Sequence, residues 1–186
     1  HEHKHDHGHD HEKHEFGSDF HVWLDPQNAI AMTKMITKAL GKTYPENRSL
    51  YKSNAKSLIA EIDALDDELK KQLAPVQNLP FIVFHDGYQY FEKHYGLNAV
   101  GSITLNPEQN ISAKRIQEIQ DKLQETKAVC IFREPQFNNK LVETVIEGTD
   151  TKSATLDPLG AKLEPGAGLY FALMRQLARD LVGCLS

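Results

Sequence analysis

The stretch FIVFHDGYQYFEKHYGL, residues 81–97, joins a short apolar run to a segment with helical spacing. The run 81–84 has the length of a buried strand, and a helix is expected from about Gly87 to His94. Three further strand–helix pairs are expected downstream. They are strand 98–103 with helix 112–124, strand 128–132 with helix 137–147, and strand 152–156 with helix 167–182. This alternation predicts an α/β fold with a four-stranded parallel sheet flanked by helices.

Upstream of this sheet, the segment 45–75 is bracketed by Pro45 and Pro75, and its apolar residues recur every three to five positions. The pattern predicts one amphipathic helix of about 28 residues, roughly 40 Å long, which can bridge two lobes. Before it, Asp25-Pro26 is a helix-start signal, and Gly41 is expected to end that earlier helix.

Composition and charge exclude several classes of protein. The formal net charge is −5, and residues 1–15 contribute −3 of it, so no basic face favours nucleic acid. No apolar run approaches the roughly 20 residues that span a bilayer, and no transmembrane segment is expected. The sequence has neither a start methionine nor a signal peptide, which suggests a processed, truncated or partial product.

The residues that could bind a metal or take part in a reaction follow the carboxyl ends of the expected strands. Ligands bind at that edge of an open parallel sheet. The first strand ends at His85, the third leads to Arg133 and Glu134, and the fourth leads to Asp157. His21 stands just before a helix start, in the segment ahead of the long helix. Imidazoles with a carboxylate or water form tetrahedral zinc sites. The sequence therefore predicts a Zn²⁺ site between two lobes, with His21, His85 and Asp157 as its metal ligands.

The opening HEHKHDHGHDHEKHE, residues 1–15, alternates histidine with acidic residues. Such a tract offers many interchangeable ligands without fixed geometry, and ordering it costs roughly 1–2 kcal/mol of backbone entropy per residue. Accessory, loose zinc binding is the preferred interpretation, and an engineered tag or a solvated linker are the alternatives. The histidines involved are His1, His3, His5, His7, His9, His11 and His14. His94 is expected to be an ordinary exposed histidine on a helix surface.

Cys130 and Cys184 lie 54 positions apart, which does not match a zinc-binding pair. Two buried thiols and one disulfide are equally compatible with this spacing.

Four motifs in this order resemble the metal-binding solute-binding proteins of bacterial ABC importers, and among them the zinc-uptake members. The motifs are HVWLDP (21–26), FIVFHDGYQYFEKHYGL (81–97), REPQF (133–137) and TLDPLG (155–160). The resemblance covers residues 16–186, and the acidic-histidine tract resembles the charged loop of the zinc-specific members. It implies a periplasmic protein, a monomer, that captures zinc with high affinity in an interlobe cleft and delivers it to an ABC permease of the inner membrane.

The resemblance also assigns residues and segments. His21 and His85 would be metal ligands, Asp157 would hold the fourth position, and Cys130 and Cys184 would form a disulfide. Manganese-binding relatives place a carboxylate where His85 stands, and imidazole favours zinc. The family's N-terminal lobe, which supplies another histidine ligand, is absent, so this chain alone is expected to bind zinc more weakly than an intact protein. The implied parts are a flexible loop 1–18, an N-terminal-lobe remnant 19–44, the linking helix 45–75 and a C-terminal α/β lobe 76–186.

A zinc-dependent hydrolase is the alternative function. It would use His21, His85 and Asp157 as ligands, with Glu134 or Glu108 as the general base. No nucleophile-elbow, phosphate-loop or H-E-x-x-H pattern supports it, and the protein is expected not to be an enzyme.

Overall fold

The computed structural model describes residues 19–105, 111–138 and 140–186. The loop expected at 1–18, with its accessory histidines, and Glu108 lie outside these residues. The elements are η1 (Val22–Leu24), α1 (Pro26–Thr43), η2 (Pro45–Asn47), α2 (Arg48–Leu73), η3 (Ala74–Val76), β1 (Phe81–His85), α3 (Gln89–Tyr95), β2 (Ala99–Thr104), α4 (Ala113–Thr126), β3 (Cys130–Arg133), α5 (Lys140–Ile146), β4 (Lys152–Thr155) and α6 (Leu169–Leu185).

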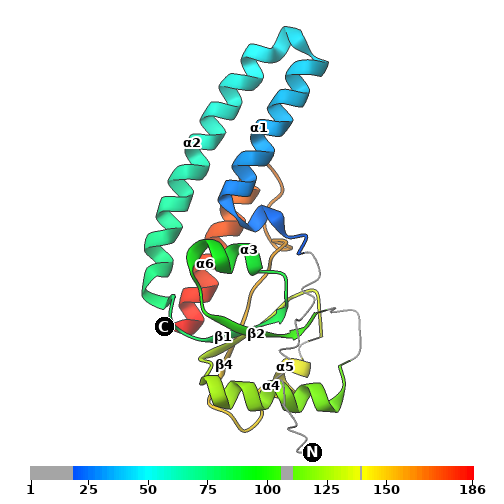
Figure 1. Cartoon of the computed structure of the whole chain (residues 1–186), viewed down its shortest axis with the longest axis vertical. Helices are drawn as coiled ribbons and strands as arrows, with labels where there is room; N and C mark the ends of the chain where they lie inside the picture. Colours follow the sequence, from blue (N-terminus) through cyan, green and yellow to red (C-terminus); the bar gives the residue numbers. More distant parts are fainter. Residues whose placement is uncertain (1–18, 106–110, 139) are drawn as a thin grey trace, which may run out of the picture.

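The four strands form one parallel sheet in the order β2-β1-β3-β4, which confirms the predicted fold (Figure 1). All five residues of β1 are buried, as expected for a central strand covered on both faces. Since β1 and β3 are neighbours, the residues that follow them meet at the same edge of the sheet.

Alternate residues of the central strands enter different apolar clusters, because successive strand side chains point to opposite faces. Phe81 and Val83 pack with residues of α2, α3 and α6 on one face. Ile82 and Phe84 pack with residues of α4 and α5 on the other. The sheet is thus the middle layer of three, and its polar edge is left for a site.

Helices α1 and α2 form an antiparallel hairpin that projects away from the sheet (Figure 1). The long helix is confirmed, with 26 residues in α2. The prediction that Gly41 ends α1 is wrong, since the helix continues to Thr43. Gly41 instead permits close approach of the two helices: a Cβ there would lie 3.2 Å from Cγ of Arg48, whose Nε donates to the Gly41 carbonyl. Among the residues described, no helix is long and apolar enough to cross a membrane.

His94 is not the exposed surface histidine expected from the sequence. Its side chain is 13% exposed, with Nδ1 3.0 Å from Oδ1 of Asp25 and Nε2 2.8 Å from Oδ1 of Asp66. Lys70 also donates to Asp66, at 2.8 Å. This ring therefore joins α3 to the N-terminus of α1 and to the C-terminal half of α2, a set of contacts that local sequence does not reveal.

Asp66 gives this junction a pH dependence. Burial raises the pKa of its carboxyl, but hydrogen bonds from Lys70 and His94 outweigh burial and lower the pKa below the ordinary value of 3.8. A group whose pKa is lower in the folded state stabilises the protein at pH values above its pKa in the unfolded state. This stability is lost as the pH falls through the pKa of the folded state.

We therefore expect Asp66→Asn to lower the free energy of unfolding at pH 7 by about 2 kcal/mol, the scale of a buried hydrogen bond to a charged group. It should also flatten the loss of stability below about pH 4. Urea unfolding between pH 7 and pH 2.5 measures both. Asp67→Asn, at the neighbouring exposed position, is the control and should give the same dependence of unfolding free energy on pH as the wild type. Identical curves for Asp66→Asn and Asp67→Asn would contradict the assignment.

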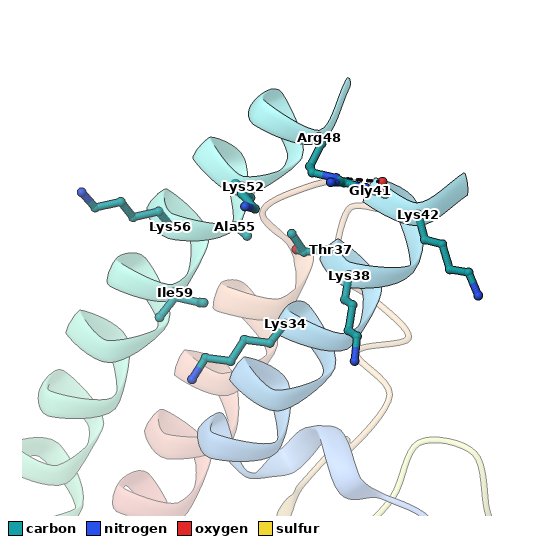
Figure 2. A pocket seen from close by; sticks show the side chains of 10 residues that line it. All are labelled: Lys34, Thr37, Lys38, Gly41, Lys42, Arg48, Lys52, Ala55, Lys56 and Ile59. Atoms are coloured by element: carbon teal, nitrogen blue, oxygen red, sulfur yellow. Dashed lines mark hydrogen bonds between the residues drawn. The ribbon is translucent and has the colours of Figure 1, made fainter. Parts of the chain in front are cut away.

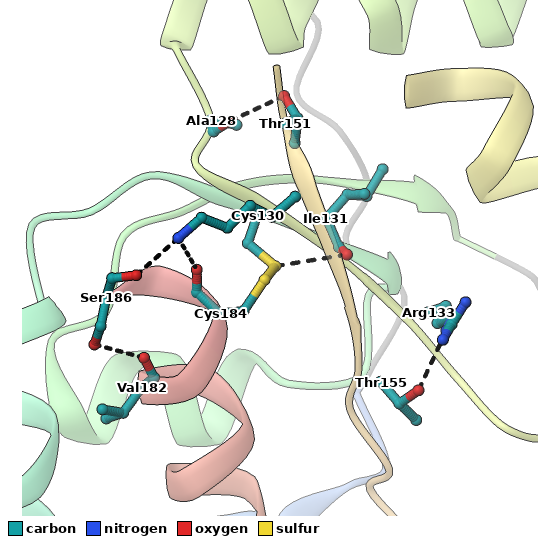
Figure 3. Close-up of a disulfide and its surroundings, with 10 residues drawn as sticks. Ala128, Cys130, Ile131, Arg133, Thr151, Thr155, Val182, Cys184 and Ser186 are labelled. Atoms are coloured by element: carbon teal, nitrogen blue, oxygen red, sulfur yellow. Dashed lines mark hydrogen bonds between the residues drawn. A yellow bond between two sulfur atoms is a disulfide. The ribbon is translucent and has the colours of Figure 1, made fainter. Parts of the chain in front are cut away.

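Cys130 and Cys184 form a disulfide, as the resemblance implied (Figure 3). Both residues are buried, and the bond fixes the last turn of α6 to β3 in the sheet. Beside it, the ammonium of Lys152 donates to the carbonyls of Cys184 and Ser186, at 3.3 and 2.7 Å. The C-terminal helix is thus held on the sheet by covalent and polar contacts together.

Candidate metal centre

His21 is positioned by the short helix η1 that follows it. Leu24 of this helix is fully buried in the main core, and the Trp23 indole donates to the carbonyl of Pro158 at 3.1 Å. Asp25 then caps α1 through the amide of Gln27. These contacts fix the backbone on the C-terminal side of His21 and turn its ring toward the sheet edge, beside the ring of Trp23.

His85 is the last residue of β1, and Gly87 makes room for its ring. A Cβ on Gly87 would lie 2.2 Å from Nε2 of His85 and 2.8 Å from Cε1 of His21, closer than real contacts allow. Only glycine fits this position without displacing the rings. The Gly87 amide donates to the His85 carbonyl, which closes the turn after β1.

The two rings lie together although 64 residues separate them in sequence. Their Nε2 atoms are 3.4 Å apart, and the ring centroids are 5.0 Å apart. Two zinc–nitrogen bonds of about 2.0–2.1 Å at a tetrahedral angle would separate the nitrogens by about 3.3–3.4 Å. The observed spacing therefore fits two imidazoles on one tetrahedral ion.

A carboxylate accepts a hydrogen bond from the far nitrogen of each ring. His21 donates from Nδ1 to Asp19 at 2.7 Å, and His85 donates from Nδ1 to Glu134 at 2.5 Å. With the proton on Nδ1, each Nε2 presents a lone pair, and the two lone pairs face each other. This repulsion is relieved by a cation between them, and carboxylates behind the rings are the common arrangement at histidine metal sites.

Asp19 interacts electrostatically with two more carboxyl groups near the pair, those of Asp86 and Glu92. Burial raises the pKa of Asp19, but hydrogen bonds from His21 outweigh it and lower the pKa, so the group is ionised at neutral pH. Burial raises the pKa of Asp86. Burial, together with the charges of Asp86 and Asp19, raises the pKa of Glu92 to about 8. The ionised carboxylate of Asp19 behind His21 favours a cation at the pair, whereas a pKa of about 8 leaves Glu92 mostly protonated at neutral pH.

Asp157 is not brought into a group with the two histidines. Its carboxylate accepts hydrogen bonds from the amides of Leu159 and Ala161, at 3.0 and 2.6 Å, and from the side chain of Gln136 at 2.7 Å. In the part of the chain that the structure describes, no three His, Cys, Asp or Glu residues are arranged to hold a metal ion. The role of Asp157 as a ligand stays a prediction.

The sequence does not reveal the two carboxylates that are hydrogen-bonded to the histidine pair. The sequence offers Glu134 only as a possible general base; in the structure it is 2% exposed, and its contact with His85 holds the orientation of that ring. Asp19 carried no signal in the sequence beyond its place two residues before His21. The adjacency of β1 and β3 is what brings Glu134 to His85, and strand order was not predicted.

A family model described as "Zinc-uptake complex component A periplasmic" (ZnuA) matches residues 1–184. Among curated relatives, the high-affinity zinc uptake system protein ZnuA of Brucella suis biovar 1 (strain 1330) is 50% identical over 168 residues, which are 90% of this chain and 50% of the relative. The protein of the same name from Yersinia pestis is 36% identical over 186 residues, 100% of this chain and 58% of the relative. The chain spans about half the length of the curated relatives it matches.

Solved structures show the same fold. A crystal structure of ZnuA superimposes with a TM-score of 0.79 at 28% identity and covers 91% of this chain and 61% of that one. A mutant of the laminin-binding adhesin Lmb from Streptococcus agalactiae also gives 0.79, at 30% identity, over 90% of this chain and 63% of that one. None of these relatives carries the name of a hydrolase, and the alternative function has no support from them.

Proposed function

This chain belongs to the ZnuA family of periplasmic zinc-uptake components, and we propose that it is the zinc-holding part of such a protein. Zinc is the cargo: the chain binds Zn²⁺ between His21 and His85, and the whole protein delivers it to an ABC permease in the inner membrane. The observation that carries the proposal is the 3.4 Å separation of two Nε2 atoms whose partner nitrogens are both bonded to carboxylates.

Zinc suits these donors better than manganese does. Imidazole nitrogen is a ligand of zinc, copper and iron, whereas manganese prefers carboxylate and water. Two imidazoles leave two tetrahedral positions, which water, Asp157 or a ligand from the rest of a longer protein would fill. In this proposal residues 19–44 belong to a first lobe, α2 links the lobes, and residues 76–186 are the second lobe.

Calorimetric zinc titration of the full chain and of a chain lacking residues 1–15 tests the proposal. We expect one tighter site in both proteins and several looser sites only in the full chain. The reason is that the tract can bind zinc only at the cost of ordering its backbone. Loss of the tighter site on truncation would make the tract the principal zinc site and would overturn the proposal.

Glu134→Gln should weaken this site by 10- to 100-fold, the range typical for removing a carboxylate behind a metal-bound histidine. The glutamine amide has the same shape but no charge. His85 therefore loses the carboxylate that accepts the hydrogen bond from its Nδ1. Competition against a zinc dye measures the affinity. Glu118→Gln on the exposed surface of α4 is the control and should have no effect. Equal affinities for wild type and Glu134→Gln would remove Glu134 from the site.

A further inference from the structure

The free end of the α1–α2 hairpin carries a concentrated positive charge. Residues 34–56 contain six cationic side chains and one carboxylate, Glu46, so the segment has a net charge of +5 in a chain whose net charge is −5. The six cations are Lys34, Lys38, Lys42, Arg48, Lys52 and Lys56. The net charge of the whole chain does not reveal this basic cluster, because acidic residues elsewhere outnumber its cations.

These cations line a groove between the two helices. Three lie on α1 and three on α2, and each set is spaced by four residues, so each follows one face of its helix. The groove has a volume of about 770 Å³, and small or apolar residues complete its wall (Figure 2). They are Thr37, Gly41, Ala55 and Ile59. We call these ten residues the basic groove.

The positive charge of the basic groove is not neutralised within the described part of the chain. The ion pairs found there involve other cations, such as Lys70, Lys114 and Arg175. Arg48 donates to a carbonyl, that of Gly41, and not to a carboxylate. Clustered like charges raise the local potential and attract anions. The groove is therefore suited to an anionic partner.

The directions of the side chains indicate an extended partner more than a compact ion. In Figure 2, Lys42 and Lys56 point away from the groove on opposite sides, so the six charges are spread around the hairpin end. Exposed apolar side chains occupy the same end: Tyr44 is 49% exposed and Leu50 is 56% exposed. Cations on long apolar stems beside an exposed aromatic residue are typical of segments that lie at a membrane–water interface.

We propose that the end of the α1–α2 hairpin binds the surface of a membrane containing anionic phospholipids. Clusters of four to eight lysines or arginines bind such surfaces electrostatically. The cations of the basic groove would contact lipid phosphates, and Tyr44 and Leu50 would enter the headgroup region. None of these residues belongs to the metal centre, so the proposal stands apart from zinc binding.

Co-sedimentation with lipid vesicles tests this directly. We expect the chain to bind vesicles of mixed phosphatidylglycerol and phosphatidylcholine, and to bind vesicles of pure phosphatidylcholine far less. Added salt should release the bound chain, because it screens the attraction between the cations and the lipid phosphates. Lys38→Glu with Lys52→Glu should reduce binding at least tenfold, and the milder pair Lys38→Gln with Lys52→Gln should reduce it less. Circular dichroism checks that each variant is folded.

The matched control reverses two lysines of α4 and therefore has the same net charge: Lys114→Glu with Lys122→Glu should keep the binding of the wild type. Equal loss in both charge-reversal pairs would reveal a general charge effect and overturn the proposal. So would equal binding to neutral vesicles. Binding of tripolyphosphate or duplex DNA without binding to vesicles would assign the groove to another anion and equally overturn it.

Discussion

His85→Ala is expected to remove the tighter zinc site, with a loss of affinity of at least about 100-fold. The expected loss exceeds the 10- to 100-fold typical for removing a group behind a ligand, because His85 itself supplies one of two paired Nε2 donors. Calorimetric titration of a chain lacking residues 1–15 measures the effect without loose sites in the background. His21→Ala should give the same result, since one imidazole alone leaves a single fixed donor.

His94→Gln supplies the matched control for this prediction. It also removes one imidazole, but both nitrogens of His94 already face Asp25 and Asp66, away from the pair. We expect it to lower the stability of the protein and to leave zinc affinity unchanged. An unchanged tight site in His85→Ala, or an equal loss of affinity in His94→Gln, would show that zinc binds elsewhere.

Loss of the disulfide is expected to have the largest effect on stability. Cys130 and Cys184 close a loop with a sequence separation of 54. In the chain-entropy model, a cross-link of this size stabilises the protein by about 4 kcal/mol because it lowers the entropy of the unfolded chain. We expect Cys130→Ala with Cys184→Ala to lower the free energy of unfolding by this amount in zinc-free buffer. Urea unfolding followed by circular dichroism measures it.

Dithiothreitol provides the control for the disulfide. The reductant should destabilise the wild type by a similar amount and should leave the double variant unchanged. Hydrogen exchange should quicken at the end of α6, because this helix loses its covalent attachment to β3. Equal unfolding free energies of oxidised and reduced wild type would contradict the expected contribution.

Much of the fold follows from local patterns. Four apolar runs followed by helical segments predicted the parallel sheet, and each run coincides with one of the observed strands. The proline-bracketed segment predicted α2. Gly41 was misinterpreted because a glycine that ends a helix and a glycine that admits a neighbouring helix look alike in sequence. The difference lies in Arg48, which reaches Gly41 only once the hairpin is formed.

The part of the candidate site that the sequence predicts is the pair of histidines at the ends of secondary-structure elements. His21 and His85 could be proposed together because one precedes a capped helix and the other ends a strand. The carboxylates behind them could not be assigned. The bond between Glu134 and His85 spans 49 positions and depends on strand order, and the contacts of His94 depend on the angle at which three helices meet.

The proposed zinc site requires that His21 and His85 bind one ion through their Nε2 atoms. Diffraction from crystals of the zinc-loaded chain lacking residues 1–15, recorded at the zinc absorption edge, would locate that ion. We expect a single strong anomalous peak about 2.0–2.1 Å from both Nε2 atoms. A peak bonded to only one of the two rings, or zinc found only at other residues, would contradict it.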